Sequence, residues 1–329
     1  MPDATASRWS GTPPNGWQIL RRNRVAMISL YFVIAVALFA IVTPFFLKDA
    51  IKTVSDDAFF RPFQTSADGK RFHLLGTDLN GRDLFYQLVT GAQVSLGVGL
   101  VGALVSLVVG GVYGMVSGYA GGRVDGAMMR LVDILNSIPS LLFVMIFISA
   151  FDGYFKDWLD GIRLWAQQHH RGHIEDFAAD LIPYSRIGIL VLSLGFVQWL
   201  TMARIVRGQV LVLKELAFVT ASRAMGQSWW GVLWRHLWPN LSTIVLTYLT
   251  LTIPAVIRDE SFLSFLGLGI EDPASSWGSL LKEGAQVINP LESKWWLLAF
   301  PAALMSASLL ALNFLGDGLR DAFDPRSED

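Results

Sequence analysis

Two clusters in this sequence have the composition of a metal site. His169, His170 and His173 form a His-His-x-x-His cluster, and imidazoles four residues apart can share a helix face and bind a metal. No Glu lies between them as in a zinc protease, and His pairs are weak evidence without a further ligand, so we interpret the cluster as a solvated face. Residues 78–83, Asp-Leu-Asn-Gly-Arg-Asp, resemble the start of a calcium loop but lack its length and its terminal Glu.

A third cluster, Arg258-Asp259-Glu260, follows an apolar stretch that contains Pro254. The next apolar run, 262–270, is too short to cross a membrane. Proline removes a helix hydrogen bond, and broken backbone at membrane depth survives only beside protein or a water-filled cavity. Ionisable residues at such a place mark a pathway or an internal ion pair.

Two interpretations of this region stay open. In one, Glu260 either pairs with Arg258 or faces water, and the segment lines or gates a path. In the other, the three charges pair with one another at the lipid–water interface. The first interpretation predicts these path or gate residues: Glu260, Phe262, Phe265 and Leu266.

The composition is that of a membrane protein. Of the 329 residues, 53% are hydrophobic and 16% are charged, against about 25% charged in a soluble domain. The net charge of −1 lacks the positive excess that is typical of nucleic-acid-binding proteins. Cysteine is absent, which excludes disulfides, thiolate metal sites and a Cys nucleophile. No Ser/His/Asp or paired-carboxylate set lies in the apolar stretches, so a membrane-embedded enzyme is a remote alternative.

Six stretches are long and apolar enough to predict membrane spans, which need roughly 20 residues. Three arginines precede the first stretch, which is itself long enough to span, so we expect no cleavable signal there. The predicted spans are 26–47, 92–116, 134–151, 181–200, 241–257 and 295–315.

The charges of the connections predict the orientation. The connection 201–240 is rich in Arg and Lys and holds one acid, whereas 152–180 is acidic. The positive-inside rule therefore places both termini and 201–240 in the cytoplasm. The loop 48–91 carries six basic residues and argues weakly the other way, but long loops indicate orientation less reliably than short ones.

Small residues recur every fourth position along the second predicted span, which lets another helix approach closely. We interpret the stripe as internal packing, and a seam with a second chain in a heterodimer is the alternative. Its last two members could lie past the helix end. The stripe consists of Gly102, Ser106, Gly110, Gly114, Gly118 and Gly122.

The segment 218–240, FVTASRAMGQSWWGVLWRHLWPN, has good helix formers around 215–228, and Gly226 can end a short helix at the membrane surface. Pro239 and Asn240 are interpreted as the stop before the fifth span.

The insert 152–180 has apolar residues at helical spacing, which predicts an interfacial amphipathic helix; these are Trp158, Ile162 and Trp165.

From residue 76 to 325 the chain resembles the C-type permease subunits of oligopeptide and dipeptide ABC importers. The motifs that carry the resemblance are LGTDLNGRDL at 75–84, SGYAGGRVDGAMMRLVDILNSIPSLLF at 117–143, MARIVRGQVLVLK at 202–214, ESFLSFLGLG at 260–269, SSWGSLL at 275–281 and NFLGDGLRDAFDP at 313–325. Their order and spacing make the resemblance specific. It implies an all-α integral membrane fold, with one N-terminal helix and a five-helix core.

The resemblance also implies an ATPase-docking segment: an Ala-Ala-like pair, a Gly, and an apolar residue before Pro. The family usually has Glu where this chain has Thr220. The docking residues carried over are Thr220, Ala221, Ser222, Arg223, Ala224 and Gly226. Arg223 is the candidate polar contact to an ATPase, and a basic residue that faces lipid head groups is the alternative for it. The implied division is an N-terminal segment 1–25, a first helix 26–47, an external loop 48–91, a core 92–316 with docking loop 201–240, and a tail 317–329.

The function that the resemblance implies is import of oligopeptides or dipeptides across a bacterial inner membrane. The implied partners are a homologous B-type permease, two ABC ATPases and an external substrate-binding protein. The chain has no Gly-x-x-x-x-Gly-Lys-Ser/Thr loop, so we expect ATP and Mg²⁺ to be bound by the ATPases and no cofactor here. A self-contained secondary transporter is the alternative, but we find no internal repeat.

Overall fold

The computed structural model describes residues 16–46, 58–66, 72–271, 274–288 and 293–323. Helices dominate this part of the chain. The elements are α1 (Gly16–Arg22), α2 (Arg24–Phe46), β1 (Gln64–Thr65), β2 (Phe72–His73), α4 (Leu84–Ala120), α5 (Gly122–Asn136), α6 (Ser140–Gln168), α7 (Gly172–Leu181), the 3₁₀ turn η1 (Ile182–Tyr184), α8 (Ser185–Leu213), α9 (Ala217–Ala224), α10 (Trp229–Val232), the π-helical turn η2 (Leu233–Leu237), α11 (Trp238–Phe265), α12 (Trp277–Gln286) and α13 (Trp296–Phe323).

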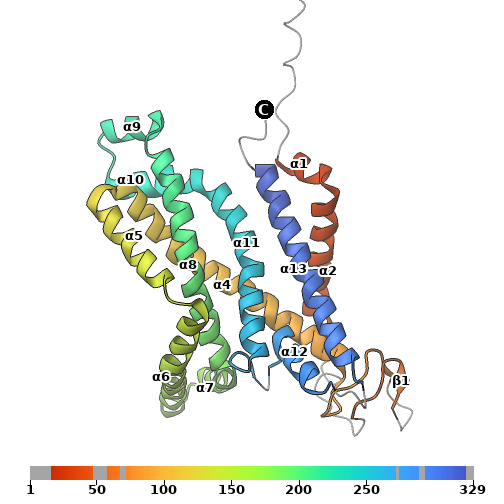
Figure 1. Ribbon diagram of the computed structural model, residues 1–329. Coiled ribbons are helices and arrows are strands. Elements are labelled where there is room, and N and C mark those ends of the chain that lie inside the picture. The colour runs from red at the N-terminus through yellow and green to blue at the C-terminus, as the bar shows by residue number, and fades with distance from the viewer. Residues whose placement is uncertain (1–15, 47–57, 67–71, 272–273, 289–292, 324–329) are drawn as a thin grey trace, which may run out of the picture.

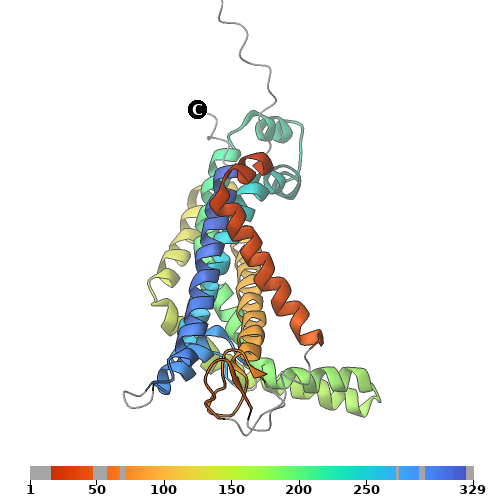
Figure 2. The same ribbon diagram turned by 90° about the vertical axis from the view of Figure 1, so that its right-hand side faces the viewer.

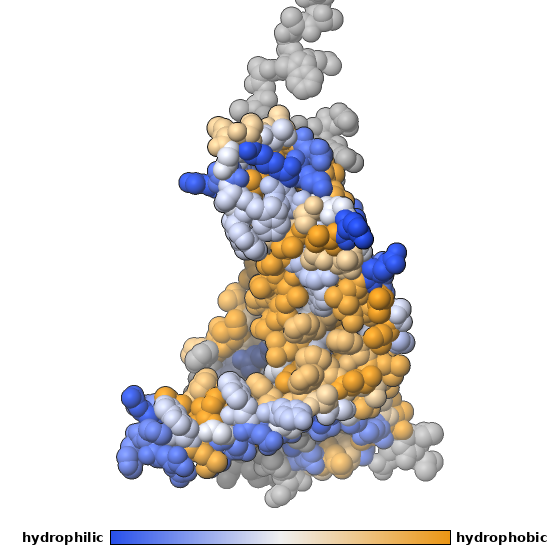
Figure 3. All heavy atoms as spheres, turned by 90° about the vertical axis from the view of Figure 1, so that its left-hand side faces the viewer, coloured by the Kyte–Doolittle hydropathy of each residue, from blue (hydrophilic) through white to orange (hydrophobic). Residues whose placement is uncertain are grey.

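The long helices form a bundle with two distinct ends (Figure 1). At the α9 end lie α1, α9, α10 and the last turns of α13. At the opposite end, called the β1 end, lie the antiparallel β1–β2 pair, α7 and α12. Five helical segments among the described residues are long and apolar enough to cross a membrane, or six if the bent pair α5–α6 is one span. A broad hydrophobic surface covers the middle of the molecule above a band of hydrophilic side chains at the β1 end (Figure 3).

The third predicted span, 134–151, is wrong as a continuous helix. The chain breaks between Asn136 and Ser140, and α6 leaves α5 at 88°. Pro139 explains the break, because proline lacks an N–H and disfavours the helical conformation of the residue before it. The other five predicted spans lie within or largely within single long helices.

The small-residue stripe of α4 is a seam within this chain, as the internal-packing interpretation predicts. A Cβ atom on Gly110, Gly114 or Gly118 would lie 2.5–2.9 Å from a backbone carbonyl oxygen of α8. Because glycine has no side chain, the two backbones approach closely along three turns. Gly118 still belongs to α4, whereas Gly122, with φ +55°, begins α5 after the chain has turned.

Pro239 and Pro254 both lie inside α11, which corrects two predictions. Pro254 does not break the span, because α11 continues through it to Phe265; its side chain is buried against neighbouring helices. Pro239 is no stop either, since it lies in the first turn of α11. The π-helical turn η2 directly before it opens the helix, which relieves the clash of the proline ring with the carbonyl four residues earlier.

The insert 152–180 is helical, as predicted, but it is not a separate helix. It comprises the second half of α6 and nearly all of α7, which pack against each other. This hairpin projects sideways at the β1 end (Figure 2). Three predicted boundaries also move: 84–91 belong to α4, 201–213 to α8 and 317–323 to α13.

Candidate functional site: the docking segment and the outer segment

The segment predicted to dock an ATPase contains a short helix, α9, and Gly226 forms the end of that helix. The Gly226 N–H donates to the Arg223 carbonyl at 2.9 Å, and the Gln227 N–H donates to the Ser222 carbonyl at 3.2 Å. This is the Schellman arrangement, which needs a residue with positive φ, and Gly226 has φ +81°. Glycine adopts that conformation without a Cβ penalty, so the sequence itself ends α9 here.

The two faces of α9 differ. Val219 and Ser222 are buried, and Val219 belongs to a core cluster that joins α4, α8, η2 and α11. Ala221 and Ala224 are exposed, and Met225 is 82% exposed. The Ala-Ser pair of the docking motif is therefore split: one member faces outward and the other anchors the helix.

Thr220 and Arg223 make contacts within the chain. The Thr220 hydroxyl donates to the Leu216 carbonyl at 3.3 Å. The Arg223 Nε donates to the Tyr119 hydroxyl at 3.1 Å, and the guanidinium lies 4.5 Å from the centre of the Tyr119 ring. Tyr119 also contacts the Trp229 ring at 5.3 Å. The sequence predicts an ATPase, or alternatively lipid head groups, as the partner of Arg223, and it gives no sign of Tyr119, which joins α4 to α9 and α10.

A charged cluster lies near the same end and was also missed. Arg207 on α8 donates two hydrogen bonds to Asp125 on α5, at 2.5 and 2.6 Å, and the Ser117 hydroxyl of α4 donates to the same carboxylate at 2.6 Å. Bidentate pairs of this kind are among the stronger hydrogen bonds in proteins. Lys214, at the end of α8, donates to the Gly118 carbonyl at 3.0 Å. Together these bonds tie α4, α5 and α8 beneath α9.

At the β1 end, Glu260 is completely buried rather than exposed to water. Three serine hydroxyls donate to its carboxylate: Ser264 at 2.7 Å, Ser261 at 3.2 Å and Ser95 at 3.3 Å. The Ser95 hydroxyl oxygen in turn accepts a hydrogen bond from the backbone N–H of Trp277 in α12 at 3.1 Å. Glu260 therefore joins α4, α11 and the start of α12. Hydrogen-bonded hydroxyls offset the cost of burying its carboxyl group.

Glu260 meets neither Arg258 nor water, the two partners that the sequence predicts for it. Arg258 pairs with Asp259 at 3.2 Å, and Gln198 of α8 donates to Asp259 at 3.0 Å. The interpretation in which all three charges pair together is therefore wrong as well. Phe262, Phe265 and Leu266 have exposed side chains, and their role as a gate remains a prediction.

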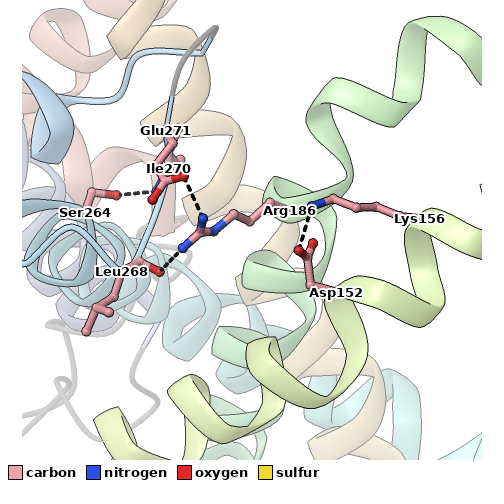
Figure 4. Close-up of polar contacts among 7 residues, drawn as sticks. All are labelled: Asp152, Lys156, Arg186, Ser264, Leu268, Ile270 and Glu271. Atoms are coloured by element: carbon pink, nitrogen blue, oxygen red, sulfur yellow. Dashed lines mark hydrogen bonds and ion pairs between the residues drawn. The ribbon is translucent and has the colours of Figure 1, made fainter.

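The segment 266–271 after α11, here called the outer segment, is held by α8. Arg186 donates to the Glu271 carboxylate at 2.7 Å and to the Leu268 carbonyl at 3.5 Å, alongside the Asp152–Lys156 pair of α6 (Figure 4). The Ile270 N–H donates to the Ser264 hydroxyl at 3.0 Å. Gly267, with φ +80°, lets the chain turn out of the helix.

The two metal-like clusters have structural partners. A ring nitrogen of His169 lies 2.8 Å from the Trp165 carbonyl oxygen. Asp78 accepts hydrogen bonds from the backbone N–H groups of Asn80 and Arg82, and Asp83 caps α4 by accepting the Phe85 N–H. Within the described residues no group of three His, Asp or Glu side chains could hold a metal ion.

Comparisons with known proteins give the family. The model of the binding-protein-dependent transport system inner membrane component matches residues 110–329, and the N-terminal transmembrane domain of oligopeptide transport permease C matches 15–62. The oligopeptide transport system permease protein OppC of Escherichia coli K12 is 42% identical over 94% of this chain and 91% of its own length. The dipeptide transport system permease protein DppC of Bacillus subtilis is 35% identical over 95% and 85%. This chain therefore belongs to the family of binding-protein-dependent transport system inner membrane components, as a permease of the oligopeptide permease C type.

Proposed function

We propose that this chain is the transmembrane permease subunit of an ATP-driven, binding-protein-dependent importer of peptides. The names of its relatives, oligopeptide and dipeptide permeases, support peptides as the substrate class. A homologous B-type permease supplies the other half of the path. Two ABC ATPases bind ATP and Mg²⁺, because this sequence has no phosphate-binding loop of that type, and an external binding protein delivers the peptide.

One observation supports the docking assignment: the exposed face of α9 consists of small and apolar side chains, and the opposite face of the same helix is packed against the helix bundle. Ala221, Ala224 and Met225 are exposed and can enter a cleft on an ATPase, while Val219 and Arg223 hold α9 to the core and to α4. A partner that moves α9 therefore moves the long helices with it. The α9 end is cytoplasmic in this proposal, and so are both termini, which agrees with the basic character of 201–240.

Single cysteines test the docking assignment without background, because the chain has none of its own. Cysteines replacing Ala221 or Met225 are expected to crosslink to the ATPase in the assembled complex. A cysteine replacing Ser222 is the matched control on the same helix, because its side chain is buried and should not react. Equal crosslinking at Ser222 and Ala221, or none at any position in an intact complex, would show that this face of α9 is not the docking surface.

The outer segment and the end of α11 form the gate in this proposal. Phe262, Phe265 and Leu266 are exposed in the single chain and face the path in the complex. Cysteines at these positions are expected to react with water-soluble reagents at different rates in resting and ATP-trapped complexes. State-independent labelling would instead indicate an ordinary solvated surface.

A further inference from the structure

The hairpin α6–α7 carries an exposed aromatic stripe that the transport function does not explain. On α6, Tyr154 is 75% exposed, Trp158 59% and Trp165 50%, and their spacing of four and seven residues puts them on one helix face. On α7, Ile174 and Phe177 form a second exposed apolar stripe. Large contiguous apolar surfaces of this kind mark contact with a partner or a membrane.

The stripe is not needed to hold the hairpin together. Within the hairpin, Leu159 and Ala166 of α6 and Ala178 of α7 are buried, and the two helices pack against each other. The other flank of α6 is polar, with ion pairs between Lys156 and Asp152 at 2.7 Å and between Arg163 and Asp160 at 3.9 Å. The exposed stripe is thus a separate face.

The stripe continues a hydrophobic surface on the same helix. Phe147 contacts Phe143 at 6.1 Å and Phe151 at 4.6 Å between ring centres, and Phe151 is exposed just before Tyr154. The first half of α6 is apolar and belongs to the bent pair that can form one span. A face that begins in the apolar half of α6 and changes to Tyr and Trp matches the preference of these two side chains for the membrane interface.

The charge of the hairpin limits the kind of lipid surface that it can contact. Residues 152–181 contain six acidic against three basic side chains. This excess disfavours an anionic lipid surface, so the stripe itself must supply the attraction, through burial of apolar area. The hairpin projects sideways at the β1 end, so it lies beside the edge of the broad hydrophobic surface rather than beyond the end of the bundle (Figures 2 and 3).

We propose that α6 and α7 lie in the headgroup region of the leaflet at the β1 end. Tyr154, Trp158 and Trp165 point toward the acyl chains, and Asp160 and Gln167 point toward water. The hairpin thereby fixes α8, which follows it directly, relative to the membrane plane. The proposal rests on the proposed function only in that the cytoplasmic assignment of the α9 end makes this the outer leaflet.

Site-directed spin labelling of the assembled transporter in phosphatidylcholine nanodiscs tests this. Single cysteines replace Trp158 and Trp165 on the stripe, and Asp160 and Gln167 on the exposed polar flank of the same helix serve as matched controls. The ratio of oxygen to water-soluble nickel-chelate collisions is expected to be several-fold higher on the stripe than at the controls, because oxygen concentrates among acyl chains. Binding-protein-free and binding-protein-saturated samples should give the same ratio.

Two results would overturn the proposal. Equal access of the nickel chelate to both faces would place the hairpin in water. Exclusion of both reagents from the Trp158 and Trp165 positions would mean that protein covers the stripe. Peptide uptake by the same complex in liposomes is measured separately, so failure of the importer assignment would leave the labelling result intact.

Discussion

The Arg223 guanidinium stacks on the Tyr119 ring at 4.5 Å from its centre and also donates a hydrogen bond to the Tyr119 hydroxyl at 3.1 Å. This contact joins α9 to the end of α4, 104 residues earlier in the chain. Because the Tyr119 ring also meets Trp229, one side chain fixes both ends of the segment between α9 and α10. Under the proposed function, in which α9 docks an ATPase, a helix fixed in this way transmits displacement rather than absorbing it.

Tyr119→Leu is therefore expected to uncouple ATP hydrolysis from transport in the assembled complex. The substitution removes the hydrogen bond and the cation–π contact, so α9 can move without α4. Tyr119→Phe keeps the ring and should have a smaller effect. The measurement is peptide molecules imported per ATP hydrolysed, with Tyr31→Leu on the exposed face of α2 as control. An unchanged ratio in Tyr119→Leu would show that the contact does not transmit motion.

Loss of the Asp125 carboxylate is expected to destabilise the protein. Asp125→Asn weakens both hydrogen bonds from Arg207 and leaves its guanidinium without a counter-charge, at a cost of about 1.5–3 kcal/mol. Asp133→Asn is the matched control, because the Arg204–Asp133 pair is exposed and should contribute at most about 1 kcal/mol. Denaturation of the purified complex measures both. Equal effects would mean that the Asp125 cluster is no more than a surface pair.

Release of the outer segment is expected to follow from Arg186→Gln. The Arg186–Glu271 pair is partly exposed, so its loss should not unfold the chain. It should instead raise the population of molecules in which the outer segment is released from α8 by about two- to fivefold. Under the proposed function this raises ATPase activity in the absence of the binding protein. Arg258→Gln removes a pair between adjacent residues of α11 and serves as control. The same rise in both variants would assign the effect to lost positive charge alone.

The seam between α4 and α8 is expected to be intolerant of a single methyl group. A Cβ at Gly114 would lie 2.5 Å from the Ala203 carbonyl oxygen, so Gly114→Ala should destabilise the protein by about 1–3 kcal/mol. Gly97 lies on the same helix with nothing within 4 Å, so Gly97→Ala should be neutral or stabilising by up to about 1 kcal/mol. Thermal denaturation compares the two, and a neutral Gly114→Ala would contradict the close approach of the backbones.

Several features of this protein follow from the sequence because they are local. The length of each apolar stretch determines most of the spans, since a helix must satisfy its own backbone in lipid. Gly226 ends α9 through its own backbone preference, and the break after α5 at Pro139 has the same local origin, although the predicted span 134–151 runs across it. The family motifs are likewise contained in the order of residues along the chain, so the sequence alone predicts the family.

The partners of the charged side chains were decided only by the tertiary structure. Arg207 meets Asp125 across 82 residues, and Ser95 meets Glu260 across 165, separations at which no spacing rule operates. The sequence predicts that Pro254 breaks its span, but α11 continues through this residue, which is buried in the folded chain. The inward direction of Ser222 and the outward direction of Ala221 depend on which side of α9 meets the core, because a helix eight residues long presents both faces until something packs against one of them.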